Sequence, residues 1–156
     1  DLEIKKNKIK KKYDLIFYLN EHENKDTNLQ IKLANNLSSN FKIITVGKKI
    51  KNSKIINLGY IPRNNLLKIL EKTKFAFLSP ENLYSLFAID SISSNTNIFF
   101  KKIKNYKSFK LKGIYYLDYN NYNNLLIQIE RQLIKKFVFT IKYIKIKENF
   151  INYFKL

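Results

Sequence analysis

The chain has 156 residues, of which 45% are hydrophobic, which is enough for one domain with a buried core. It has no Cys, and His22 is its one His, so metal or catalytic sites built on cysteine or on several histidines are excluded. No apolar run approaches the roughly 18 residues of a membrane span, and no signal peptide is visible. Because the chain also contains no Met, we expect it to be a piece of a longer, cytoplasmic protein.

The formal net charge is +18, from 30 Lys and Arg residues against 12 Asp and Glu residues. Such a balance by itself suggests nucleic acid or an anionic membrane as a partner. However, Arg63 and Arg131 are the only arginines, and Lys, Ile, Asn, Phe and Tyr dominate the chain, as in proteins encoded by AT-rich genomes. Arg, rather than Lys, provides bidentate recognition of phosphate and guanine. We therefore interpret the charge as a solvated Lys-rich surface and do not expect nucleic-acid binding.

Short apolar runs alternate with amphipathic segments along most of the chain. The predicted strands are residues 13–19, 41–46, 54–58, 75–78, 96–100 and 113–117. The predicted helices are residues 27–39, capped by Asp26 or Thr27, then 63–72, a helix opening at 79–82 and ending near 93, and 120–135. This alternation predicts an α/β fold, a Rossmann-like three-layer sandwich whose mostly parallel sheet has about six strands, with helices on both faces.

The ends of the chain differ in composition from its centre. Residues 1–12 are dense in Lys and indicate a linker or arm. Residues 13–135 form the predicted domain. Residues 136–156 are amphipathic, and we expect a helical tail there.

Ligands of such sheets bind beyond the carboxyl ends of the strands, beside helix N-termini. Lys25 precedes the first predicted helix, where an ammonium and free backbone N–H groups form an anion site, although an ordinary solvent-facing Lys is the alternative. We expect His22, in the same loop, to be simply exposed. Gly47 ends the second predicted strand, where it permits close backbone approach to a ligand, or a turn.

The end of the fourth predicted strand carries two acidic residues, Glu81 and Asp90. Their carboxylates could accept hydrogen bonds from sugar or ribose hydroxyls. The alternative is that Glu81 stabilises a helix dipole and Asp90 is a surface residue. Backbone N–H groups that could meet a diphosphate belong to Asn82, Leu83 and Tyr84. The sequence has neither a G-x-G-x-x-G nor a Walker motif, which disfavours nucleotide-binding enzymes of those types.

The order of these elements resembles the C-terminal, donor-binding domain of GT-B glycosyltransferases, especially the retaining family with an E-x7-E motif. The resemblance covers roughly residues 13–135. The segments that carry it are residues 41–47, 55–60 with 66–70, 75–81, 90–98, and 113–117 followed by 121–132. Asp90 stands in place of the second Glu, and the acidic pair is spaced one residue wider. Asp26 follows Lys25 where the family has a Gly.

The resemblance implies that Asp90 holds the donor ribose, that Glu81 contacts the transferred sugar, and that Lys25 binds phosphate. The substrate would be a UDP- or GDP-sugar, with no metal and no tightly bound cofactor. A missing N-terminal domain would supply the acceptor site, so the isolated piece should be inactive. A lysine-rich surface could also meet an anionic membrane at its cytoplasmic face. Two alternatives stay open: a non-catalytic GT-B-like scaffold, and a basic α/β domain that binds RNA or anionic lipid.

Overall fold

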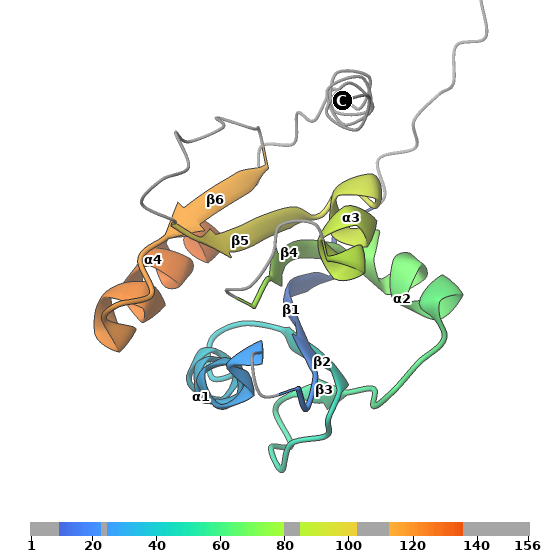
Figure 1. The fold of residues 1–156 in the computed structure, drawn as a ribbon, viewed down its shortest axis with the longest axis horizontal. Coiled ribbons are helices and arrows are strands. Elements are labelled where there is room, and N and C mark those ends of the chain that lie inside the picture. Colours follow the sequence, from blue (N-terminus) through green and yellow to red (C-terminus); the bar gives the residue numbers. More distant parts are fainter. Residues whose placement is uncertain (1–9, 23–24, 80–84, 103–112, 136–156) are drawn as a thin grey trace, which may run out of the picture.

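The computed structural model describes residues 10–22, 25–79, 85–102 and 113–135 (Figure 1). Its strands are β1 (Tyr13–Leu19), β2 (Ile43–Gly47), β3 (Ile56–Asn57), β4 (Thr73–Phe77), β5 (Asn97–Lys101) and β6 (Ile114–Leu117). Its helices are α1 (Thr27–Leu37), α2 (Arg63–Leu70), α3 (Leu86–Ser93) and α4 (Tyr122–Ile134). The strands form one parallel sheet in the order β3-β2-β1-β4-β5-β6. The predicted Rossmann-like fold class is confirmed.

Successive side chains of the strands point to opposite faces of the sheet and pack into two separate hydrophobic cores. Leu15 and Phe17 of β1 pack with the inner faces of α1 and α4, whereas Ile16 packs with α2 and α3 on the opposite face. All three side chains are fully buried, and burial of each contributes roughly 2 kcal/mol to stability. Figure 1 shows the two helix pairs on opposite sides of the sheet. The molecule therefore has the three layers that the sequence predicted.

Two predicted boundaries are wrong. The third strand is only Ile56–Asn57, and α3 begins at Leu86 rather than near residues 79–82. Ser85 sets this start, because its Oγ accepts a hydrogen bond from the backbone N–H of Ala88 at 3.2 Å. Residues 1–9 of the predicted arm and the predicted tail, 136–156, lie outside the described residues. No helix within the described ranges is long and apolar enough to cross a membrane.

Gly47 is the last residue of β2 and lies beside Leu19, the last residue of β1. Its φ is +92°, and its N–H donates to the carbonyl of Gly59 at 2.8 Å. A Cβ at position 47 would lie 2.2 Å from the carbonyl oxygen of Leu19, which also accepts a hydrogen bond from the N–H of Lys48. The backbone of β1 therefore requires a glycine here, independently of any ligand.

Gly47→Ala should destabilise the chain by more than about 2 kcal/mol, because the new Cβ meets a backbone atom that cannot move freely. Gly59→Ala is the matched control. The φ of Gly59 is also positive, at +68°, but a Cβ added there would first meet the flexible Lys49 side chain at 3.0 Å. A loss of about 1 kcal/mol is therefore expected for Gly59→Ala. Urea unfolding of both variants measures the difference. Equal losses would contradict the proposed clash with Leu19.

The amino end of the sheet holds a partly buried lysine. The Lys11 ammonium donates to the carbonyl of Asn95 at 2.9 Å, at the turn that follows α3. Burial lowers the pKa of Lys11 from its ordinary 10.5 to about 8, and the nearby negative charge of Glu71 opposes part of this shift. The charged form of Lys11 is therefore less favourable in the folded state than in the unfolded chain.

The Lys11 shift predicts that stability rises with pH between about pH 8 and pH 10.5. In this window the unfolded chain holds the Lys11 proton and the folded chain has released it, so the unfolded state binds more protons. Urea unfolding of wild type and Lys11→Met should be compared at pH 7 and pH 10. Wild type should gain stability relative to the variant at the higher pH. A difference that stays constant, or falls, would contradict the shift.

Candidate functional site

The strand order reverses between β1 and β4, which lie side by side in the sheet. In open parallel sheets, ligands bind at the carboxyl end of such a switch point. A residue from the loop after β6, Tyr119, reaches this edge: its hydroxyl donates to the carbonyl of Leu78 at 3.1 Å, and its ring stacks on Phe77 with centroids 5.3 Å apart. Burial raises the pKa of Tyr119, and the negative charge of Asp26 raises it further, so the phenol stays neutral.

The start of α1 differs from the predicted cap. Asp26 occupies the N-cap position in the left-handed region, with φ +48°, and its side chain makes no capping hydrogen bond. The Thr27 hydroxyl instead donates back to the carbonyl of Asn20. Buried Gln30 donates from Nε2 to the carbonyl of Lys25 at 2.8 Å. Asp26 thus has the backbone conformation that a glycine adopts freely, with a carboxylate added.

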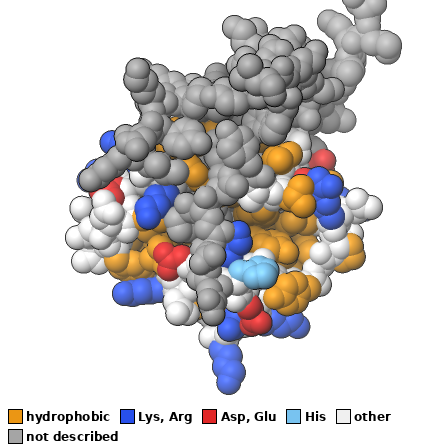
Figure 2. All heavy atoms as spheres, viewed as in Figure 1, with side chains coloured by type: hydrophobic (Ala, Val, Ile, Leu, Met, Phe, Trp, Pro, Cys, Tyr) orange, Lys and Arg blue, Asp and Glu red, His pale blue; other side chains and the backbone are white. Residues whose placement is uncertain are grey.

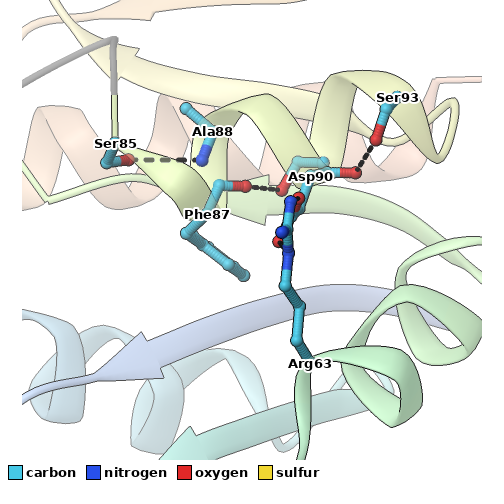
Figure 3. Close-up of polar contacts among 7 residues, drawn as sticks. Arg63, Ser85, Phe87, Ala88, Asp90 and Ser93 are labelled. Atoms are coloured by element: carbon cyan, nitrogen blue, oxygen red, sulfur yellow. Dashed lines mark hydrogen bonds and ion pairs between the residues drawn. The ribbon is translucent and has the colours of Figure 1, made fainter.

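Asp90 is buried, so the alternative of a surface residue is wrong. Its two carboxylate oxygens accept hydrogen bonds from Arg63, from Nε at 3.0 Å and from Nη2 at 2.6 Å (Figure 3). The pair joins the second turn of α3 to the first residue of α2. These hydrogen bonds raise the pKa of the Arg63 guanidinium, and the negative charge of Asp90 adds to the effect.

The two partners differ sharply in exposure. The Arg63 side chain is 61% exposed, whereas that of Asp90 is 4% exposed. The sequence prediction did not assign Arg63 to the site. A usable signal was present, because Arg63 is one of two arginines in a lysine-rich chain and follows a predicted strand at its carboxyl end. A planar guanidinium can hold both oxygens of a carboxylate at once, which a Lys ammonium cannot do.

The remaining predicted site residues are placed as follows. Lys25 precedes α1, and Gly47 ends β2 at the same edge of the sheet. His22 is exposed, as expected. Four predicted residues lie outside the described ranges, namely Glu81, Asn82, Leu83 and Tyr84. The described segments hold no group of three His, Cys, Asp or Glu side chains that could bind a metal ion.

On the face seen in Figure 2, the described Lys and Arg side chains lie in separate groups among hydrophobic and other side chains.

Similar folds occur among solved structures. A variant of TarM from S. aureus, in complex with Fondaparinux, alpha-GlcNAc-glycerol and UDP, matches 81% of this chain with a TM-score of 0.61 and 16% identity. E. coli heptosyltransferase WaaC with ADP matches 78% with a TM-score of 0.51 and 11% identity. The fold is GT-B-like.

Another match to this GT-B-like domain is UDP-GlcNAc 2-epimerase from Methanocaldococcus jannaschii, in complex with UDP-GlcNAc and UDP. It matches 86% of the chain, with a TM-score of 0.55 and 13% identity. The chain spans 29%, 43% and 42% of these three proteins, so it corresponds to less than half of each. No protein-family model and no curated protein matches the sequence. Because a transferase and an epimerase share the fold, the fold alone does not fix the reaction.

The Arg63–Asp90 pair of the GT-B-like domain should contribute asymmetrically to stability. Arg63→Ala leaves a buried carboxylate unpaired and should lower the melting temperature by about 5 °C or more. Asp90→Ala leaves an exposed guanidinium that water can solvate, so its loss should be smaller. The double variant should resemble Asp90→Ala alone. Thermal unfolding of the three variants measures this, and additive losses would show that the pair is not coupled.

Proposed function

We propose that this chain is the donor-binding half of a glycosyltransferase that uses a nucleoside diphosphate sugar. The observation that carries the proposal is the parallel sheet, with its switch point between β1 and β4, which matches nucleotide-bound GT-B-type structures over most of the chain. The three matched structures share a bound nucleotide rather than a single reaction. Nucleotide binding is therefore the better supported part of the proposal, and sugar transfer follows from the resemblance.

The proposed roles follow the carboxyl edge of the sheet. Lys25 precedes the start of α1, and its ammonium would stabilise the charge of the diphosphate there. Gly47 keeps a side chain away from the end of β1. Glu81 would contact the sugar. The backbone N–H groups of residues 82–84 would donate hydrogen bonds to the phosphates. Asp90 would either accept a hydrogen bond from the ribose or act by positioning Arg63.

In the proposed reaction, the bond between the anomeric carbon and the diphosphate oxygen breaks, and a bond to the acceptor oxygen forms. The nucleoside diphosphate leaves with the electron pair, so positive groups at the carboxyl edge favour its departure. The acceptor proton would pass to a base on the N-terminal domain that the resemblance implies. This chain by itself should therefore bind the donor without turnover. Contact of its lysine-rich surface with an anionic membrane would bring the site close to a lipid acceptor.

A non-catalytic GT-B-like module is the second candidate. Two observations favour it: Asp26 directly follows the proposed phosphate-binding Lys25 in the chain, and the carboxylate of Asp90 is already occupied by Arg63. A negative charge beside the site would oppose diphosphate binding. Such a module would keep the fold and serve in contacts with other proteins.

Titration with UDP, GDP and ADP should raise the unfolding midpoint of the chain. A ligand present at 100 times its Kd stabilises the native state by about 2.7 kcal/mol. Lys25→Gln should weaken UDP binding by about tenfold, because a charge-assisted hydrogen bond is worth about 1.5–3 kcal/mol. Lys42→Gln removes the same charge at the opposite, amino end of the sheet, next to Asp14, and should leave binding unchanged. Isothermal calorimetry gives the Kd values.

The absence of stabilisation by all three nucleotides at millimolar concentration would contradict the proposed function and favour the non-catalytic module. Equal weakening by Lys25→Gln and Lys42→Gln would point to nonspecific attraction by the net charge. RNA binding whose affinity falls steeply with salt would instead support the nucleic-acid alternative.

A further inference from the structure

The Asp90 carboxylate is poorly placed to receive a ribose directly. Its side chain is 4% exposed, and each of its two oxygens already accepts a hydrogen bond from Arg63. A ribose hydroxyl would have to displace the guanidinium or approach a carboxylate that is closed to solvent. Displacing it would leave the buried carboxylate without its positive partner, which opposes the exchange. The structure therefore separates the buried acidic residue from the surface that a ligand can reach.

The Arg63 side chain provides that surface. A guanidinium has five N–H donors, and Asp90 occupies one on Nε and one on Nη2, which leaves three for another acceptor. The two parallel hydrogen bonds also fix the plane of the guanidinium, so little side-chain freedom remains to be lost when a ligand binds. Figure 3 shows the Arg63 side chain extending from the start of α2 to Asp90 on α3.

The position of Arg63 in the fold fits this role. Arg63 is the first residue of α2, which follows the carboxyl end of β3. It therefore belongs to the edge of the sheet where parallel α/β folds bind ligands. An exposed guanidinium at this edge attracts an oxyanion, whereas a carboxylate would accept hydrogen bonds from hydroxyl groups.

We propose that Arg63 is a ligand-contacting residue of this site, that its ligand is a phosphate oxygen, and that Asp90 is a positioning residue acting through Arg63. The proposal rests on the proposed nucleotide-sugar function and specifies it further. It changes the chemistry at position 90 from direct recognition of a hydroxyl to indirect support of oxyanion recognition.

Binding of UDP and of uridine by calorimetry separates the two chemistries, because uridine keeps the ribose and lacks the phosphates. Arg63→Gln should raise the Kd of UDP by about tenfold or more and leave the Kd of uridine unchanged. Asp90→Asn should raise the Kd of UDP by a smaller factor, again without affecting uridine. Arg131→Gln, which removes the other arginine from the exposed side of α4, is the matched control and should change neither.

Several outcomes would overturn the proposal. If Asp90→Asn weakens uridine and UDP equally, Asp90 contacts the ribose itself. If Arg63→Gln binds UDP within twofold of wild type, Arg63 does not contact the phosphates. Should Arg63→Gln fail to fold by circular dichroism, Arg63→Lys replaces it: the charge is kept and the planar fork is lost, so an intermediate Kd is expected, and wild-type affinity would count against the proposal.

Inorganic pyrophosphate separates this proposal from the proposed function. If wild type binds no nucleotide, the nucleotide-sugar function fails. Pyrophosphate binding that Arg63→Gln weakens, and that Arg131→Gln does not, would then still support an oxyanion site at Arg63. If the wild-type chain binds neither nucleotide nor pyrophosphate, or if Arg63→Gln leaves pyrophosphate binding unchanged, the Arg63 proposal is overturned as well.

Discussion

The structure depends on the burial of β1 between two strands and two helical layers. β1 pairs with β2 on one edge and with β4 on the other, and its residues 15, 16, 17 and 19 are fully buried. A strand in this position must have every backbone polar group paired, because water cannot reach it. The backbone at the end of β1 therefore has little freedom to move. Leu19 at that end is approached closely by Gly47, and the strand order of the sheet reverses at β1.

Most of this arrangement could be predicted from the sequence, for a physical reason. A strand buried on both faces needs a continuous apolar run, and residues 13–19 provide one. Amphipathic segments between such runs then favour helices that cover both faces. The start of α3 could not be predicted in the same way. Several polar residues precede that helix, and which of them caps it depends on the path of the chain in three dimensions, where Ser85 is the residue that bonds Ala88.

The candidate site was only partly predictable. Lys25, Gly47 and Asp90 were singled out by their places after strands or in an acidic motif. The partner of Asp90 lies 27 positions away on a different helix, and Tyr119 lies 41 positions from the carbonyl that it bonds. A single sequence contains no signal for contacts over such separations. Gly47 shows the opposite case: the residue was noticed, but a neighbouring strand, rather than a ligand, already explains it.

The left-handed conformation of Asp26 has a consequence for how this chain can diverge. A G-to-A change in the second codon position converts a glycine codon into an aspartate codon. At a position with φ +48°, aspartate is tolerated at modest cost, so the path of the backbone need not change. Such a change alters the electrostatic potential beside Lys25 while the fold is kept. In a lineage whose base composition drifts, single-nucleotide changes can therefore alter the chemistry of the sheet's edge while the architecture of the domain is kept.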